Sequence, residues 1–256
     1  MVEFTKEGSL GIITLNRPPA NSYNIEFVEA LGKAIKEAEQ EEVKVVIVRS
    51  ALDRFFSGRA DVKAFSENPP HANMAMVKRA HEVLNKIASI PKIFIAEIAG
   101  HALGGGLEIA LACDLRFGAK GEYRLGLPEV TLGLLPGTGG TQRLPRLIGW
   151  GKALELMVSG QTLTPDEAYH LGILNRLYPD RDTLERETRL FAQTLAQGAT
   201  LAIAHIKRAV HEGMNKGLDE GLRLERELVE QLFYSEDGQE GVRAFLEKRK
   251  PTFRGR

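Results

Sequence analysis

The sequence predicts an α/β protein with a largely parallel sheet, followed by a tail of helices. Strand-like and helix-like segments alternate as far as Cys113, whereas helical patterns dominate beyond about residue 139. The 256 residues are 43% hydrophobic and 27% charged, which is typical of globular proteins with a sizeable core. Because the chain exceeds the usual domain length of about 150 residues, we expect an α/β core over 1–190 and a C-terminal helical region over 191–256.

The first element is predicted to be a hairpin. The strands Val2–Thr5 and Leu10–Leu15 flank the turn Glu7-Gly8-Ser9, and Pro18 and Pro19 end the second strand. Helices and strands then alternate through the core. The expected segments are a helix from Asn24 to Glu41, a buried strand Val43–Val48, a helix Met74–Ala88, a strand Lys92–Ile98 and an apolar helix Gly105–Cys113. Such alternation is typical of parallel strands joined by helices.

The C-terminal part has one short predicted strand, Leu174–Tyr178, and several helices. Thr164-Pro165-Asp166-Glu167 has the pattern of a capping box with proline at the first helical position. Further helices are expected at 181–196, 200–212, 218–234 and 239–248. Within the third of these helices, an apolar stripe is positioned to cover either the core or a neighbouring subunit; it consists of Leu218, Leu222, Val229 and Leu232.

Composition excludes several classes of function. Lysine plus arginine and aspartate plus glutamate each number 34, so the chain has no general electrostatic attraction to nucleic acid or anionic lipid. The single cysteine, Cys113, excludes an intrachain disulfide and a zinc site with two thiolates. We see neither a signal-peptide pattern nor an apolar run of about 18 residues. We therefore expect a cytoplasmic protein that binds no metal and spans no membrane.

The segment from Ile98 to Gln142 combines glycine-rich turns with isolated acidic residues. Three glycines, 104–106, precede an apolar helix, and the N–H of Gly105 is expected to be free for a ligand oxygen. Glu108 lies on the same helix face, one turn further on. Because a lone buried charge costs several kcal/mol, Glu108 is either part of a structural ion pair or a functional residue.

A second acid, Glu129, is the only charged residue between Leu125 and Gly133. It is either functional or an ordinary acid of a surface loop or helix terminus. The glycine-rich turn Leu135–Thr141 has a phosphate-binding appearance, but it lacks a Walker lysine. The glycines at 104–106 also fail the dinucleotide-binding spacing, since position 109 is isoleucine. A nucleotide-binding loop is therefore disfavoured.

Together these segments resemble the crotonase, or enoyl-CoA hydratase/isomerase, superfamily. The likeness covers nearly the whole chain, through Ile12–Pro18, Ala102–Asp114, Leu127–Leu144 and Glu240–Pro251. It implies a crotonase-type spiral of ββα units, a C-terminal helical region that forms trimers, and a homohexamer built as a dimer of trimers. The implied activity is that of an enoyl-CoA hydratase, which adds water to trans-2-enoyl-CoA in fatty-acid β-oxidation without a metal or redox cofactor.

The resemblance also implies roles for individual residues. The thioester oxygen of the acyl-CoA substrate is expected between the N–H groups of Ala60 and Gly105, although Gly58 lies one position earlier than usual and Arg59 stands where glycine is common. Glu108 and Glu129 match the two catalytic glutamates of hydratases, with Glu108 as base and Glu129 as acid. The remaining matches are Gly137, which positions the reacting water, and the CoA-binding residues Ser57, Ala60, Val62, Phe245 and Lys248.

The basic tail offers further contacts for CoA. Lys248, Arg249 and Lys250 are candidates for its phosphates, whereas the alternative is a solvated basic end of the chain. Asp61 is expected to cap the helix that follows it. Three other functions are considered: an enoyl-CoA isomerase that uses one carboxylate, an RNA-binding protein with steep salt dependence, and a catalytically silent assembly protein. The presence of both Glu108 and Glu129 disfavours the last.

Overall fold

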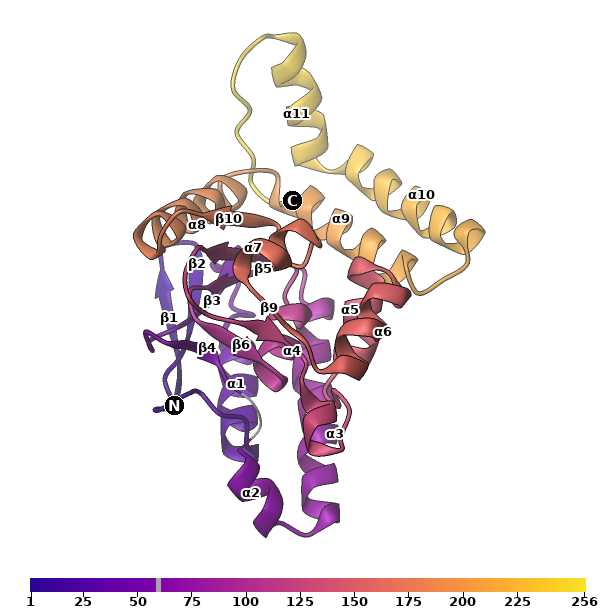
Figure 1. The fold of residues 1–256 in the computed structure, drawn as a ribbon. Helices are drawn as coiled ribbons and strands as arrows, with labels where there is room; N and C mark the ends of the chain where they lie inside the picture. Colours follow the sequence, from indigo (N-terminus) through magenta and orange to yellow (C-terminus); the bar gives the residue numbers. More distant parts are fainter. Residues whose placement is uncertain (59–60) are drawn as a thin grey trace.

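The computed structural model describes residues 1–58 and 61–256 and contains two sheets. The larger sheet has the strand order β1-β2-β3-β5-β7-β10, in which only the β1–β2 hairpin is antiparallel (Figure 1). Its strands are β1 (Val2–Glu7), β2 (Leu10–Leu15), β3 (Val45–Ser50), β5 (Ile93–Ile98), β7 (Leu115–Ala119) and β10 (Arg176–Tyr178). The predicted hairpin and parallel core are confirmed.

The smaller sheet has the order β4-β6-β8-β9 and was not expected from the sequence. Its strands have only two or three residues each: β4 (Phe55–Ser57), β6 (His101–Leu103), β8 (Leu125–Gly126) and β9 (Thr162–Leu163). The first three are parallel to one another, and β9 is antiparallel to β8. This sheet is short, but the segments that follow its parallel strands carry the candidate site.

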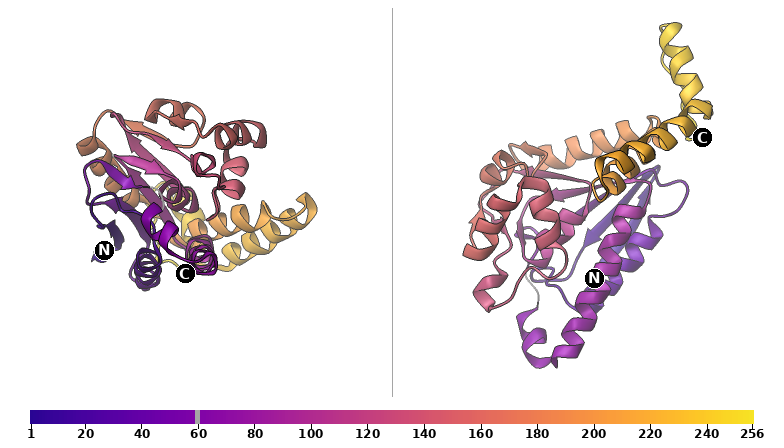
Figure 2. Two further views of the ribbon diagram at one scale, coloured as in Figure 1. Left: turned by 60° about the horizontal axis from the view of Figure 1, so that its bottom comes forward. Right: turned by 90° about the vertical axis from the view of Figure 1, so that its right-hand side faces the viewer.

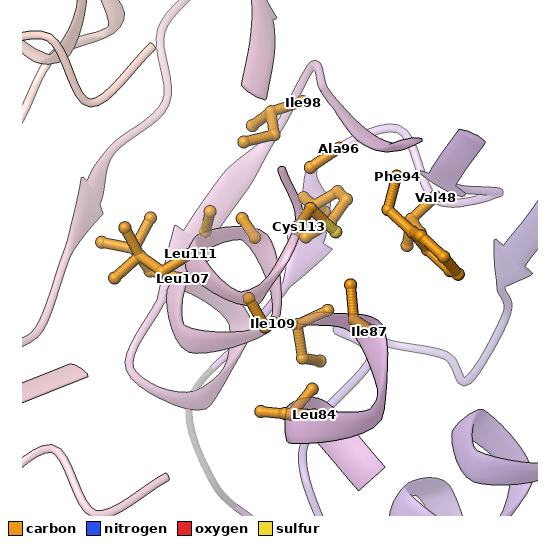
Figure 3. Packing of buried hydrophobic residues seen from close by; sticks show 14 of the residues in the cluster. Val48, Leu84, Ile87, Phe94, Ala96, Ile98, Leu107, Ile109, Leu111 and Cys113 are labelled. Carbon is orange, nitrogen blue, oxygen red and sulfur yellow. The ribbon is translucent and has the colours of Figure 1, made fainter. Parts of the chain in front are cut away.

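Helices cover both faces of the larger sheet. On one face, α1 (Ile25–Glu37), α3 (Pro70–Ser89) and α4 (Gly105–Ala112) share the main core with Val46, Val48 and Phe94 of the sheet. Figure 3 shows Leu84 and Ile87 of α3 beside Ile109 of α4. On the other face, α8 (Arg181–Ala196) packs Leu184 and Ala192 onto the alternate residues of the same strands. Residue 190, where the sequence placed the end of the core, lies within this helix.

Local signals account for where several helices begin. The Asn24 side chain accepts the Phe27 N–H at 2.9 Å and caps α1 as expected. Both hydrogen bonds of the predicted capping box are present at α7 (Pro165–His170). The helix expected to start at Met74 begins earlier, at Pro70, because proline fits the first helical position without losing a hydrogen bond. The remaining short helices are α2 (Val62–Glu67), the 3₁₀ helix η1 (Glu129–Leu132), α5 (Gly140–Ile148) and α6 (Trp150–Ser159).

Three helices form the C-terminal region: α9 (Thr200–Gly213), α10 (Leu218–Tyr234) and α11 (Glu236–Leu246). Helices α9 and α10 lie side by side, and α11 projects away from the core (Figures 1 and 2). A buried ion pair fixes α9 to the core, since Lys207 Nζ lies 2.9 Å from Asp114 Oδ2. Leu218 and Phe233 of α10 and Phe245 of α11 are 78%, 71% and 83% exposed, so the apolar residues of these helices are largely uncovered within one chain.

Candidate active site

The candidate site lies where three neighbouring strands of the smaller sheet end. Strands β4, β6 and β8 are parallel and adjacent, so their carboxyl ends lie at the same edge of the sheet. Ser57 ends β4, Gly104 and helix α4 follow β6, and Glu129 follows β8 after two intervening residues. The topology therefore brings together segments that are far apart in the sequence. The edge formed by carboxyl ends of parallel strands is where α/β proteins commonly bind ligands.

Two glycines allow β4 to approach the start of α4. Gly104 has φ 55° and ψ −127°, a conformation that is essentially restricted to glycine. At Gly106, an added Cβ atom would lie only 2.1 Å from the carbonyl oxygen of Ser57. A side chain at position 106 would therefore push the end of β4 away from the helix. The glycine run predicted to serve a ligand also serves this close backbone contact.

The N–H of Gly105 is available to a ligand. Gly105 is the first residue of α4, and its N–H has no hydrogen-bond acceptor among residues 1–58 and 61–256. The adjacent groups are occupied, because Gly104 N donates to Gly126 O at 2.9 Å and Glu108 N donates to Gly104 O at 3.0 Å. A free N–H at the positive end of the helix dipole suits a ligand oxygen that carries negative charge.

Glu108 is buried, and the glycine-rich turn surrounds its carboxylate. Glu108 belongs to α4 and is 2% exposed. Its Oε1 accepts the N–H of Thr138 at 2.8 Å and that of Gly140 at 2.7 Å. Its Oε2 accepts the hydroxyl of Thr138. No ion pair to Glu108 is found in the described part of the chain, so the structural ion pair considered above is not what holds this carboxylate.

The turn at 135–141 thus holds a carboxylate of the protein itself. Its N–H groups point at Glu108, which explains the phosphate-binding appearance of the sequence without a nucleotide. Neighbouring helices fix the turn: His81 Nε2 of α3 donates to Gly137 O at 2.7 Å. Arg143 of α5 donates to Thr138 O at 3.2 Å and to Asn85 Oδ1 at 2.7 Å. Burial lowers the pKa of Arg143, and the nearby Glu108 opposes that shift.

Glu129 lies at the same edge as Glu108. It is the half-buried first residue of η1, and its carbonyl oxygen accepts the Leu134 N–H at 3.2 Å. The preceding Leu127 packs against the turn that holds Glu108: a Cβ added at Gly140 would meet Leu127 Cδ1 at 2.8 Å and Glu108 Oε1 at 3.0 Å. The two predicted acids therefore reside in segments that touch each other.

The other residues predicted around the thioester are only partly described. Arg59 and Ala60 lie outside the described residues. Ser57 is buried, and its hydroxyl donates to Asn21 O at 2.8 Å, so this hydroxyl is engaged within the protein. Val62, the first residue of α2, is 50% exposed. Asp61 caps α2, as expected, by accepting the Ala64 N–H at 3.2 Å.

The C-terminal candidates for CoA lie away from this site within one chain. Phe245 of α11 is exposed, and Lys248 follows the helix in a left-handed conformation with φ 54°. Arg249 is paired with Glu240 at 2.6 and 2.9 Å and with Glu247 at 2.6 Å. Its guanidinium is therefore engaged, and it holds the pKa of Glu240 down at about 2. Among the described ion pairs none includes Lys248 or Lys250, so these two remain the phosphate candidates.

Several residues of the site were not anticipated from the sequence. Thr138 and Gly140 bind Glu108, and His81 and Arg143 position the turn. The clustering of glycines at 137, 139 and 140 was the available signal, but it indicated only a disfavoured phosphate loop and, through the family resemblance, a water-positioning role for Gly137. Tyr23, buried beside Gly105, gave no sequence signal at all.

Two negative findings concern the described residues only. Across 1–58 and 61–256, no three His, Cys, Asp or Glu side chains are grouped so that they would hold a metal ion. Within the same ranges, every helix is too short or too polar to cross a bilayer.

Comparison with known proteins identifies the family. Residues 5–256 match the model of the enoyl-CoA hydratase/isomerase family. A probable enoyl-CoA hydratase of Bacillus subtilis is 36% identical over 96% of this chain and 95% of its own. A short-chain-enoyl-CoA hydratase of Clostridium acetobutylicum is 35% identical over 96% and 94%.

A solved structure supports the same assignment. The crystal structure of an enoyl-CoA hydratase from Geobacillus kaustophilus is 43% identical and covers 100% of this chain and 97% of its own, with a TM-score of 0.97. The structural match extends over the whole chain, and the sequence matches extend over nearly all of it. The chain therefore belongs to the enoyl-CoA hydratase/isomerase family and has the crotonase fold.

Proposed function

We propose that the protein is an enoyl-CoA hydratase that adds water reversibly, and on one face, to trans-2-enoyl-CoA. The observation that carries this proposal is the buried carboxylate of Glu108, which is held by three donors one turn from the free N–H of Gly105. Glu129 supplies a second acid at the same edge. The relatives named as hydratases over nearly the whole chain support the assignment.

The thioester oxygen is the atom that Gly105 would bind. Addition of water to the β carbon moves electrons through the conjugated system onto this oxygen, which becomes enolate-like. The N–H of Gly105 and that of Ala60 would stabilise the developing charge. Loss of one such donor typically costs about 3 kcal/mol in transition-state stabilisation.

The two glutamates would move the protons. Glu108 takes a proton from the water as its oxygen bonds to the β carbon, and Glu129 gives a proton to the α carbon. Each proton transfer contributes on the order of 10²- to 10⁴-fold in rate. Because interacting carboxylates behave as a pair, the two roles can also be swapped or shared between Glu108 and Glu129. These steps need neither a metal nor a redox cofactor, because proton transfer and charge stabilisation suffice for them. The N–H of Gly137 would help to hold the water.

CoA binding would involve two subunits. Ser57, Ala60 and Val62 would contact CoA from the subunit that holds the thioester, whereas Phe245 lies on the projecting α11 and Lys248 follows that helix (Figure 1). The uncovered apolar residues of α9 to α11 support trimers through residues 191–256, and hexamers as dimers of trimers. In such an assembly, α11 of one subunit would reach the CoA of the next. We place the enzyme in cytoplasmic fatty-acid β-oxidation, with no nucleic-acid partner.

Hydration kinetics test the proposal. Wild type, Glu108→Gln and Glu129→Gln would be compared on crotonyl-CoA, with Glu122→Gln as the matched control because Glu122 is an exposed glutamate of a turn. We expect both site variants to lose at least about 10²-fold in kcat and the control to keep wild-type turnover. Near-normal turnover of either site variant would refute its assigned role. If the protein acts on 3-enoyl-CoA and not on 2-enoyl-CoA, the proposed hydratase activity is wrong and the protein is an isomerase.

A further inference from the structure

The hydrogen bonds that residues 1–58 and 61–256 make to Glu108 leave one acceptor position on its carboxylate. An ionised carboxylate has two oxygens, each able to accept about two hydrogen bonds. Both positions on Oε1 are filled, by the N–H groups of Thr138 and Gly140. One position on Oε2 is filled by the Thr138 hydroxyl. The remaining position on Oε2 is therefore where a proton from water would be received.

The hydroxyl of Tyr23 is a second hydroxyl group near the contact between Thr138 and Glu108. Tyr23 is 2% exposed, and its hydroxyl oxygen is buried without a hydrogen bond of normal geometry to any described residue. Its ring is fixed against Gly105, because a Cβ added there would lie 3.0 Å from Tyr23 Cδ2. Glu108 lies one turn beyond Gly105 on the helix against which the Tyr23 ring packs. Burial and the charge of Glu108 raise the pKa of Tyr23, whereas a hydrogen-bonding interaction with Thr138 lowers it. A tyrosine with a raised pKa stays protonated and remains a donor.

We propose that Thr138 is a positioning residue that directs the proton of the reacting water to Oε2 of Glu108, and that the Tyr23 hydroxyl supports Thr138 during turnover. This inference rests on the hydratase function proposed above. It goes beyond that function because it assigns the transfer to one oxygen and adds two hydroxyl groups to the site.

The hydroxyl of Thr138 suits both charge states of Glu108. When Glu108 is ionised, Thr138 donates to Oε2. During hydration the O–H bond of water breaks, the proton goes to Oε2, and the water oxygen bonds to the β carbon while Glu129 protonates the α carbon. The Thr138 oxygen can then accept a hydrogen bond from protonated Oε2, and its own proton can turn toward the Tyr23 oxygen. A methyl group at this position can do neither.

Substitution of Thr138 tests the assignment. Thr138→Val keeps the shape and the backbone N–H but loses the hydroxyl, and Thr138→Ser keeps the hydroxyl. The matched control is Thr141→Val, because the Thr141 hydroxyl bonds only to the Gln142 side chain among the described residues. We expect kcat of Thr138→Val to fall roughly ten- to hundredfold at little changed KM, as for the loss of one hydrogen bond to a charged group.

The dependence of kcat/KM on pH distinguishes a positioning role of the Thr138 hydroxyl from a role in packing alone. Loss of a donor disfavours the ionised carboxylate, so the acidic limb of kcat/KM should move to higher pH in Thr138→Val and return in Thr138→Ser. Thr141→Val should match wild type in both respects. The proposal would be overturned if Thr138→Val kept both the kcat and the acidic limb of kcat/KM of wild type. It would also be overturned if Thr138→Ser were as impaired as Thr138→Val.

Tyr23→Phe gives a second test that does not depend on the stability of the Thr138 variants. Tyr23→Phe removes a buried hydroxyl that makes no hydrogen bond of normal geometry to any described residue, so thermal stability should be unchanged or higher, whereas kcat should fall several-fold. Wild-type kcat in this variant would remove Tyr23 from the mechanism. Failure of the hydratase proposal is distinguishable, because in that case wild type itself would not hydrate crotonyl-CoA; failure of the present inference would leave wild type active and Glu108→Gln inactive.

Discussion

The contact between Gly106 and Ser57 predicts a large effect from a single methyl group. In Gly106→Ala the new Cβ would stand 2.1 Å from the Ser57 carbonyl oxygen. Contacts of Cβ atoms below 3.0 Å are essentially never seen, so the backbones of β4 and α4 must separate by on the order of 1 Å. This is the place where the segment leading to position 60 meets the helix that begins at Gly105.

Two magnitudes follow from that displacement. Overpacking of a tightly packed interior typically costs about 1–3 kcal/mol of stability, and no flexible side chain is available to give way, since the atom that would be struck is backbone. A misplacement of about 1 Å in a catalytic site costs on the order of 10²-fold in rate. We therefore expect Gly106→Ala to be folded but destabilised, with kcat/KM for crotonyl-CoA reduced about a hundredfold.

Urea unfolding and hydration kinetics provide the assay, with Gly151→Ala as the matched control. Gly151 is also a helical glycine, in α6, and a Cβ added there would meet nothing within 4 Å. The control should retain full activity and gain about 0.4–1 kcal/mol from the reduced freedom of its unfolded chain. Wild-type stability and turnover in Gly106→Ala would refute the argument that this contact sets the geometry of the site.

Three further predictions concern other parts of the molecule. Lys248→Ala should raise KM for acyl-CoA, with an effect that shrinks at high salt as phosphate contacts are screened; a salt-independent KM equal to that of wild type would exclude the contact. Lys207→Met should destabilise the protein by about 3–5 kcal/mol in chemical denaturation, because it leaves the buried Asp114 without its lysine; a loss below about 1 kcal/mol would contradict this. Burial and Glu185 raise the pKa of Glu97 from 4.5 to about 7, so the folded state holds an extra proton between these values and stability should fall by at most about 3 kcal/mol as pH rises through them. Glu97→Gln should remove that decline in denaturation curves measured between pH 4 and pH 8, and an unchanged decline would show that other groups cause it.

The sequence was most informative for elements whose buried apolar residues recur at a regular spacing. Helix α1 places Phe27, Leu31 and Ile35 at helical spacing and has a polar N-cap, so its position was predicted to within a few residues. In β3, residues 45–48 are apolar and buried on both faces, and this strand was also recognised. In contrast, β8 contains only Leu125 and Gly126, and two residues carry no periodicity. Such strands exist because distant segments pair with them.

The candidate site was predictable in part for the same reason. Glu108 stood out because it is a charge within an apolar helix, and the structure buries it. Its partners could not be deduced, since Thr138 and Gly140 lie 30 and 32 residues further along the chain and reach it only through tertiary packing. The pairing of Arg249 with Glu240 likewise depends on the chain folding back along α11. Residue type indicated which groups were unusual, and only the fold determined what they contact.

The central claim is that the acyl thioester lies between the Gly105 N–H and the two glutamates. A crystal structure of the assembled protein with a non-reactive acyl-CoA tests it most directly. We predict the thioester oxygen within about 3 Å of Gly105 N, and the Glu108 and Glu129 carboxyl groups facing the α and β carbons of the acyl chain. A thioester bound elsewhere, or either carboxyl group turned away from those carbons, would contradict the account.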